Sequence, residues 1–167
     1  FNSGKTVDAI LMNSLMSIRL LYNKGLYTHC TSLLTKAKAL AYHYEKFSLI
    51  IKMLEWERNV ALINPTDIEQ ELRQINKEKL SALSHLNTIE KYQQLLDVPV
   101  RYIYGQGFIR KTSDLKKLEK IIRHPLMKSI PHSKSFSVLL GYYRTLSAYH
   151  MLKRNLRICL MLRKKIV

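Results

Sequence analysis

The sequence predicts an all-α fold, an irregular array of helical hairpins (an α-solenoid fragment) with one long central helix. Apolar residues recur at spacings of three and four along most of the chain, which is the period of helices that pack on one face. Five Gly and four Pro among 167 residues are too few for a turn-rich β architecture, and 47% apolar residues indicate a folded chain with a core. No apolar run approaches the roughly 20 residues of a membrane-spanning helix, so no membrane partner is expected.

The first two helices are predicted over residues 7–24 and 26–43, with Gly25 between them because Gly readily takes the positive φ that ends a helix. The first helix presents the apolar residues Ile10, Leu11, Leu15, Ile18, Leu21 and Tyr22. The second presents Tyr27, Cys30, Leu33, Leu34, Ala37, Leu40 and Ala41, with Lys36 and Lys38 directed outward. Small side chains let helices approach closely and bulky ones fill the grooves beside them, so this face is expected to pack on another helix.

Six of these residues form the signature of a structural repeat: Tyr22, Gly25, Tyr27, Cys30, Leu34 and Ala37. In this order and spacing they resemble the tetratricopeptide repeat over about residues 15–50. The resemblance implies stacked helical hairpins whose grooves bind peptides, often acidic ones, through Lys, Arg and Asn side chains. The first helix departs from the family pattern, because Ile18 stands where a small residue is usual.

A degenerate second copy of the repeat is predicted near residues 143–167. Arg154 aligns with Gly25, Leu156 with Tyr27, Cys159 with Cys30, Leu162 with Leu33, Lys165 with Lys36 and Ile166 with Ala37. The turn of this copy has Arg154-Asn155 in place of Gly, and Asn155 is expected to accept the left-handed conformation.

The third helix is predicted to begin near Lys46 and carries two apolar stripes. One stripe consists of Phe47, Ile50, Ile51, Leu54 and Ala61, and the other of Leu49, Met53, Trp56 and Val60. Two stripes are expected when a helix lies between neighbours in a stacked array. This pattern therefore supports the array independently of the family resemblance.

A long helical segment follows a helix-start signal at residues 64–69, where Pro65 suits the first turn and Thr66 with Glu69 forms a capping box. Its stripe recurs at spacings of four and three: Ile68, Leu72, Ile75, Lys79, Ala82, Leu86, Ile89, Gln93 and Leu96. The pattern fits one helix of about 30 residues or two helices broken near residues 81–84. The interruptions at Lys79 and Gln93 favour packing within the chain over an intermolecular coiled coil.

Pro99 and the Gly105-Gln106-Gly107 stretch predict a bend within residues 98–111, a sub-boundary in an otherwise single helical-repeat region of residues 1–167. Tyr102, Tyr104 and Phe108 lie there among Arg101, Arg110 and Lys111. Interleaved aromatic and basic residues can bind single-stranded nucleic acid, but buried aromatics at a helix junction are the favoured interpretation.

Two further helices are predicted before the second repeat copy. A short one begins at Thr112 or Ser113 and ends before Pro125, with Leu115, Leu118, Ile121 and Ile122 inward. The other runs from about Lys134 to Leu152 and presents Phe136, Leu139, Leu140, Tyr143, Leu146 and Ser147.

The net charge of +16 is concentrated in the last two fifths of the chain. Residues 1–100 hold 12 Lys or Arg against 10 Asp or Glu, whereas residues 101–167 hold 16 against 2. This asymmetry favours an acidic protein or peptide, nucleic acid or an acidic segment of the same protein as partner, although basic residues can also simply solvate an outer face. The candidate partner-binding residues are Arg144, Arg154, Asn155, Arg157, Arg163 and Lys164.

No constellation in the sequence has the spacing of a catalytic, cofactor or metal site. Glu55 and Glu57 are two residues apart on a helix and face different directions. His29 and Cys30 are adjacent, so their side chains point about 100° apart. The segment Ser3-Gly4-Lys5-Thr6 ends like a phosphate-binding loop but lacks its upstream Gly and preceding strand. No enzyme activity, cofactor or metal is therefore expected, and the six histidines lack the close pairings of metal ligands.

The sequence thus predicts a non-catalytic scaffold for protein–protein interaction that binds a protein or peptide in a helix-lined groove. The alternative is a nucleic-acid-binding helical module that uses the basic end, where Tyr142, Tyr143 and Tyr149 lie near the arginines. Cys30 and Cys159 are far apart and suit buried positions better than a disulfide framework, so a reducing, cytoplasmic location is expected. The lack of a starting Met predicts that the chain is a fragment of a longer protein.

Overall fold

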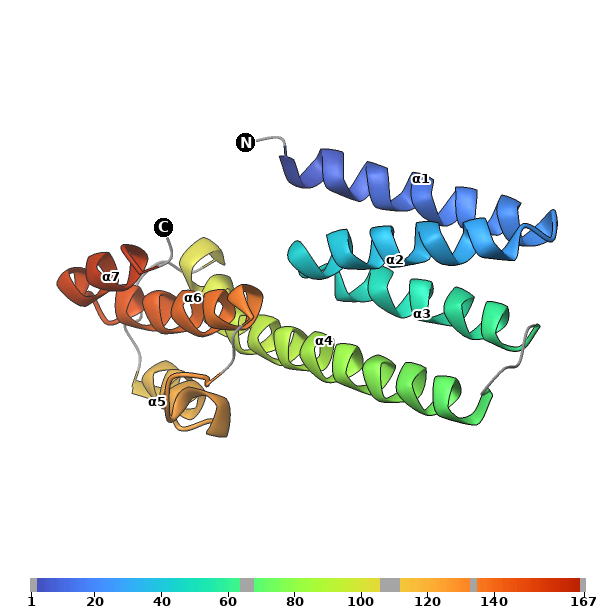
Figure 1. The fold of residues 1–167 in the computed structure, drawn as a ribbon. Coiled ribbons are helices and arrows are strands. Elements are labelled where there is room, and N and C mark those ends of the chain that lie inside the picture. The colour runs from blue at the N-terminus through green and yellow to red at the C-terminus, as the bar shows by residue number, and fades with distance from the viewer. Residues whose placement is uncertain (1–2, 64–67, 106–111, 133–134, 166–167) are drawn as a thin grey trace. The chain divides into compact units, whose positions relative to one another are not determined.

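The computed structural model describes residues 3–63, 68–105, 112–132 and 135–165. These residues form seven α-helices and one 3₁₀ helix, with no strand among them, so the all-α prediction is confirmed (Figure 1). The α-helices are α1 (Ser3–Asn23), α2 (Tyr27–His43), α3 (Phe47–Ala61), α4 (Ile68–Gly105), α5 (Thr112–Ile122), α6 (Phe136–Leu152) and α7 (Leu156–Arg163), and the 3₁₀ helix η1 is Pro125–Met127. Three residues with predicted roles lie outside the described residues. They are Thr66 of the capping box, Phe108 of the aromatic and basic stretch, and Ile166 of the second repeat copy.

The chain forms two compact units, residues 1–86 and 87–167, and α4 contributes to both. The division lies within α4, ahead of the sub-boundary that the sequence suggested near residues 98–111. The helix α4 continues through Pro99 and ends at Gly105, so the proline itself does not end the helix, and the helix end lies within the predicted range of residues 98–111. A proline in a helix lacks the N–H that would bond the carbonyl four residues earlier, here that of Leu95, and costs about 3 kcal/mol. The Pro99 ring is fully buried, and its burial offsets part of that cost.

In the first unit, α1, α2 and α3 pack side by side, and each contacts the other two (Figure 1). The core between them includes Val7, Leu11, Ile18, Cys30, Leu34, Ala37, Ala41, Leu49, Ile50, Met53 and Leu54. Along α3, the residues of both predicted stripes are buried or half-buried. The prediction of a helix covered on two sides is therefore confirmed within this unit.

Three helix-to-helix turns share one backbone geometry, at Gly25, Glu45 and Arg154. These residues have positive φ angles of 71°, 52° and 58°, respectively. At each turn the N–H of this residue donates to the carbonyl three residues before it. The N–H of the following residue donates to the carbonyl five residues before itself, as Leu26 does to Leu21. This pair of bonds is the Schellman motif that closes a helix C-terminus. The alignment of Arg154 with Gly25 holds at the turn, because Arg154 has the positive φ. The expectation that Asn155 takes the left-handed conformation is wrong, since Asn155 has φ −90° and is the N-cap residue of α7.

Replacing Gly25 with Ala is expected to lower the free energy of unfolding by about 1 kcal/mol, because an L-residue is disfavoured at φ 71°. A Cβ atom there meets no other atom within 4 Å, so the loss comes from the backbone alone. Arg154→Gly is expected to raise the free energy of unfolding, but by less than about 1 kcal/mol, because Arg154 has a further interaction that the substitution can remove. Urea unfolding followed by circular dichroism measures both, and a loss in both variants would contradict the assignment of strain to these turns.

The two cysteines occupy equivalent places beside these turns. Cys30 lies five residues after Gly25, and its thiol donates to the Ile18 carbonyl at 3.7 Å. Cys159 lies five residues after Arg154, and its Sγ is 3.2 Å from the Ser147 Oγ. Ile18 and Ser147 each precede their turn residue by seven positions. The equivalence of the two segments therefore extends from the turn into the packing of each helix pair.

Within the first unit, α4 is continuous and has no break at residues 81–84. Ile75 and Ala82 of its stripe are buried, and Ile68, Leu72, Lys79 and Leu86 are half-buried. Lys79 donates to Glu55 of α3 at 2.9 Å, and the His85 ring stacks on Phe47 with 4.9 Å between ring centroids. The stripe packs within the chain, as the interruptions in its heptad pattern indicated.

Lys38 is not directed outward, contrary to the sequence prediction. Its Nζ donates to Glu57 of α3 at 2.7 Å and to Glu78 of α4 at 3.1 Å. The Tyr42 hydroxyl donates to the second oxygen of Glu78 at 2.8 Å. Burial lowers the pKa of Lys38, but the two carboxylates outweigh it and raise the pKa above its ordinary value of 10.5. Helical periodicity failed here because it cannot show that carboxylates from two other helices meet this lysine.

In the second unit, two apolar clusters hold the helices together. One joins α4, α5 and α6 through Tyr102, Leu118, Ile121, Tyr149 and Leu152. The other joins α4, η1 and α6 through Tyr92, Met127, Val138 and Tyr142. The helix α7 packs on α6, as the second repeat copy predicts.

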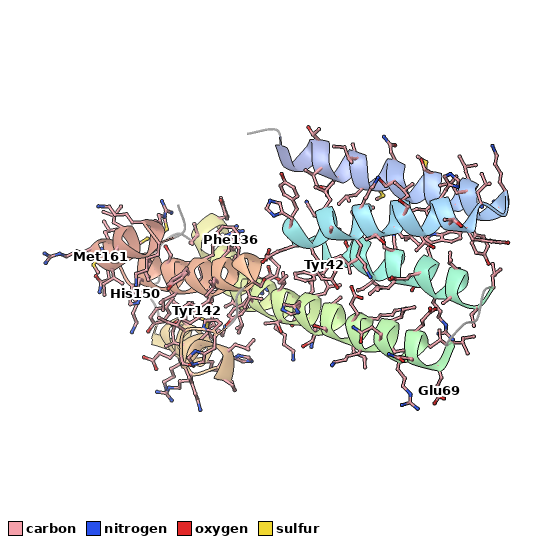
Figure 2. All side chains as sticks on the ribbon, viewed as in Figure 1. Tyr42, Glu69, Phe136, Tyr142, His150 and Met161 are labelled. Carbon is pink, nitrogen blue, oxygen red and sulfur yellow. The ribbon has the colours of Figure 1, made fainter. Side chains whose placement is uncertain are left out.

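The buried face of α6 differs from the predicted one. It consists of Val138, Tyr142, Thr145, Ser147, Ala148, Tyr149 and Leu152. Of these only Ser147 was predicted, and the predicted Phe136 is 59% exposed (Figure 2). The contact that sets this face is Gly141, where an added Cβ would lie only 2.7 Å from the Tyr92 Cβ of α4. Close approach at a glycine fixes the rotation of α6, which the apolar pattern alone left ambiguous.

Candidate functional site

The first unit has an open groove of about 450 Å³ between α1 and α3. Met12, Leu15, Met16 and Arg19 line it from α1, and Lys52, Glu55 and Trp56 line it from α3. The spacings of three and four along both helices place these residues on one face of each helix. Met12 and Met16 are 48% and 59% exposed, so apolar surface is open to solvent along the groove.

Aromatic contacts hold Trp56 in position at the groove. The Tyr22 ring lies 5.3 Å from the Trp56 ring and 5.7 Å from the Tyr27 ring, both in edge-to-face geometry. Tyr22 and Tyr27 belong to the repeat signature, so residues of that signature pack against the Trp56 side chain that lines the groove. The Trp56 indole N–H has no hydrogen-bond partner among the described residues and remains available as a donor.

The groove carries unpaired positive charge. Glu55 is neutralised by Lys79 at 2.9 Å, and Asp8 of α1 pairs with Lys46 at 2.9 Å. Arg19 and Lys52, both exposed, have no carboxylate partner within the part of the chain that the structure describes. The groove therefore combines an apolar floor of Met, Leu and Trp with two free cations.

The residues that the sequence singled out for partner binding lie on α6, α7 and the turn between them. All six are exposed: Arg144, Arg154, Asn155, Arg157, Arg163 and Lys164. Arg144 and Arg163 line one small cavity of about 210 Å³ together with Leu96, Val100, Ile103, Ser147, Ala148 and Met151. Arg154, Asn155, Arg157 and Lys164 do not line this cavity.

The tyrosines that sequence reasoning placed beside these arginines are mostly inaccessible. Tyr142 and Tyr149 are buried in the core of the second unit, and Tyr143 is half-buried, with the Lys165 Nζ 5.8 Å from its ring centroid. Tyr102 is buried at the end of α4, as favoured for the junction, but Tyr104 is 87% exposed. Stacking of bases on Tyr142 and Tyr149 would require the core to open.

The weak catalytic candidates are not brought together. Glu55 and Glu57 contact different lysines, Lys79 and Lys38. Cys30 is fully buried while His29 is exposed, and burial raises the pKa of the Cys30 thiol, which disfavours the reactive thiolate. Residues 3–6 lie in α1 and do not form a phosphate-binding loop.

The described residues form neither a metal site nor a membrane-spanning helix. Among the described residues, no group of three His, Cys, Asp or Glu is placed to hold a metal ion. In the same residues no helix is both long and apolar enough to cross a membrane. His150 has a buried Nδ1 with no partner in this part of the chain, and burial lowers its pKa below the ordinary 6.5.

The groove residues Met12, Met16, Arg19 and Lys52 were missed by sequence reasoning. A signal for them exists in α1, where Met12, Leu15, Met16 and Arg19 repeat at helical spacing beside the core stripe of Leu11 and Ile18. The stripe was not recognised because one apolar face is enough to explain a terminal helix.

Comparison with known proteins gives no relative. No protein-family model matches the chain. No curated protein and no solved structure is significantly similar to it. Functional inference therefore rests on the residues and their geometry.

Proposed function

We propose that the chain is a non-catalytic scaffold for protein–protein interaction, which binds an acidic amphipathic helix of a partner protein in the α1–α3 groove. The observation that carries the proposal is the exposed apolar floor of the groove beside Arg19 and Lys52, two cations without carboxylate partners among the described residues. Flexible methionines adapt to varied apolar side chains, and a partly exposed Trp is typical of residues that dominate binding energy.

A helix fits the length and shape of this groove. From Met12 to Arg19 the groove follows two turns of α1, about 10 Å, which matches the i, i+3, i+4, i+7 contacts of a docked helix. Carboxylates beside the apolar face of such a helix could pair with Arg19 and Lys52. The resemblance to the tetratricopeptide repeat agrees with a peptide-binding groove and with an acidic ligand.

The alternative function, binding of nucleic acid at the basic end, has one specific observation in its favour. Arg144 and Arg163 come from different helices and line the same cavity. The burial of Tyr142 and Tyr149 removes the stacking surfaces that this function would use, so the scaffold is the better supported proposal.

The scaffold is tested with a labelled helical peptide of about 18 residues that has Leu at helical spacing and Glu elsewhere. Fluorescence anisotropy is expected to detect binding to the wild type and a roughly tenfold loss in Met12→Glu, equivalent to about 1.4 kcal/mol, because this carboxylate repels the peptide and interrupts the apolar floor. Ile10→Glu is the matched control, since Ile10 is on the same helix, is 47% exposed against 48% for Met12, and does not line the groove.

Equal affinities of the two variants would contradict the groove assignment. A peptide with the same composition in shuffled order should bind at least tenfold more weakly, because it has no continuous apolar face. Binding of a single-stranded oligonucleotide with steep salt dependence, in the absence of peptide binding, would favour the alternative function.

A further inference from the structure

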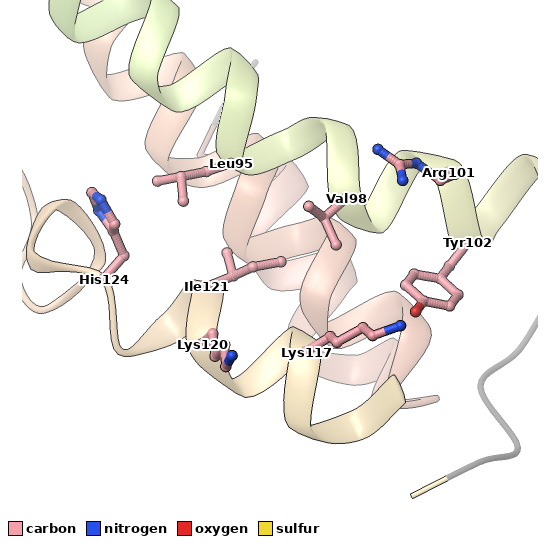
Figure 3. Close-up of a pocket in the computed structure, with 8 residues that line it drawn as sticks. All are labelled: Leu95, Val98, Arg101, Tyr102, Lys117, Lys120, Ile121 and His124. Carbon is pink, nitrogen blue, oxygen red and sulfur yellow. The ribbon is translucent and has the colours of Figure 1, made fainter. Parts of the chain in front are cut away.

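The second unit contains a separate cleft of about 620 Å³ between the C-terminal part of α4 and α5 (Figure 3). Its floor is apolar: Leu95 and Val98 come from α4 and Ile121 from α5. Leu95 and Val98 are half-buried and pack against the core cluster that contains Ile121. The floor is thus a continuation of the core that stays open to solvent.

The border of this cleft is cationic. Arg101, Lys117, Lys120 and His124 line it, and none of the described residues that line it is acidic. Figure 3 shows His124 at one end of the cleft and Tyr102 at the other, with Ile121 between the two helices. Arg101 and Lys120 have no carboxylate partner in the described part of the chain.

Asp114 contacts two residues that line the cleft, and its carboxylate is already engaged. Asp114 accepts a hydrogen bond from the Tyr102 hydroxyl at 2.9 Å and lies 3.7 Å from the Lys117 Nζ. The hydrogen bond to Asp114 raises the pKa of Tyr102, so this hydroxyl stays protonated. Lys117 is 65% exposed and its contact with Asp114 is long, which leaves its ammonium free to turn toward a ligand.

His124 supplies an N–H donor at the far end of the cleft. Its Nδ1 accepts a hydrogen bond from the Leu126 backbone N–H at 3.3 Å. A backbone N–H can only donate, so the neutral ring carries its proton on Nε2. That Nε2–H is a hydrogen-bond donor without any need for protonation of the ring.

From this combination we infer that the cleft binds a phosphate monoester that carries an apolar group. Three full positive charges and one N–H donor suit a phosphate dianion, whose oxygens accept from arginine and lysine. Leu95, Val98 and Ile121 offer a surface for the apolar group, and the cleft volume is in the range of small-molecule sites. The site is independent of the α1–α3 groove and of the scaffold proposal.

Isothermal titration of the full chain with hexyl phosphate tests the site. Hexyl phosphate is expected to bind more tightly than either inorganic phosphate or hexanol. Inorganic phosphate can contact only the cationic residues of the cleft, and hexanol can fill only its apolar floor. In the series from ethyl to hexyl phosphate the affinity should rise up to about fourfold for each methylene that becomes buried. Hexanol binding as tight as hexyl phosphate binding, or no binding of hexyl phosphate, would overturn the inference.

Charge-neutralising variants locate the site. Arg101→Gln combined with Lys120→Gln is expected to weaken hexyl phosphate binding at least tenfold, whereas Lys116→Gln leaves it unchanged. Lys116 is the matched control, because it is exposed on the same helix as Lys120 and does not line the cleft. These three side chains are at the surface, so the variants should unfold at the temperature of the wild type. Equal losses in the control and in the double variant would show unspecific charge attraction and overturn the inference.

The same variants distinguish a free organic phosphate from a lipid headgroup. Vesicles that contain phosphatidic acid are compared with vesicles of neutral lipid by co-sedimentation. Binding of hexyl phosphate without vesicle binding identifies a soluble ligand, and binding of both, each lost in the double variant, identifies the headgroup as a source of the same chemistry. Vesicle binding that persists in the double variant would contradict the role of this cleft.

Discussion

Gly141→Ala is expected to destabilise the second unit by about 2–3 kcal/mol, although it adds a single methyl group. The new Cβ would lie 2.7 Å from Tyr92 Cβ and 3.0 Å from its Cγ. A Cβ position is fixed by the backbone, so rotation of the tyrosine cannot relieve the contact and the α4 and α6 segments of this unit must separate.

Tyr92 increases the cost of that separation. It is only 2% exposed, its hydroxyl donates to the Leu126 carbonyl at 2.9 Å, and its ring lies 6.4 Å from the Tyr142 ring in edge-to-face geometry. Differential scanning calorimetry should detect a decrease in Tm of about 10 °C or more for the transition of this unit. Gly105→Ala is the control, because a Cβ there meets nothing within 4 Å and its stability should match the wild type. Equal Tm values for the two variants would rule out the tight contact at Gly141.

Lys38→Met is expected to destabilise the first unit by about 2 kcal/mol. The Lys38 side chain is 18% exposed and its Nζ pairs with both Glu57 and Glu78. Without the ammonium, two partly buried carboxylates face each other without a cation, which is costlier than the loss of one surface ion pair. The Tyr42 hydroxyl continues to donate to Glu78, so part of the network remains.

The pH dependence of this effect identifies its cause. In the wild type the raised pKa of Lys38 means that its contribution is full below about pH 10.5 and is lost as pH rises through the folded-state value. Lys38→Met lacks this contribution at every pH, so its loss of stability relative to the wild type should shrink as pH rises through the folded-state value of Lys38. Lys36→Met is the control, since Lys36 is exposed on the same helix and has no carboxylate partner among the described residues. Urea unfolding across this pH range measures both, and a pH-independent loss would point to lost packing of the lysine stem instead.

Helix positions could be predicted because helical periodicity is local. The bounds of α1, α2 and α6 and the start of α3 lie within a few residues of those expected, and all the buried residues of α2 were predicted, namely Cys30, Leu34, Ala37 and Ala41. The turn at Glu45 could not be predicted from local sequence. Glu45 adopts the same turn as Gly25, although an acidic residue gives no signal for a positive φ, and its turn is imposed by the packing of α2 on α3.

The errors have a tertiary origin. Pro99 is accommodated within α4 because its ring is buried, and Lys38 faces inward because Glu57 and Glu78 meet it there. Both features depend on residues distant in sequence. The candidate sites also depend on residues distant in sequence. Arg101 is on α4 and Lys120 is on α5, so the charges and the apolar floor of this cleft are brought together only when the two helices pack.

Each unit contains one buried cysteine, and the reactivity of that cysteine can report local unfolding of the unit. Cys30 is fully buried in the first unit and Cys159 is 5% exposed in the second, and both are free thiols. A thiol reagent can reach each one only when its helix pair separates, so the two labelling rates report local unfolding of the two units in one sample. A variant such as Lys38→Met would accelerate labelling of Cys30, and Gly141→Ala would accelerate that of Cys159, with no cysteine introduced into the chain.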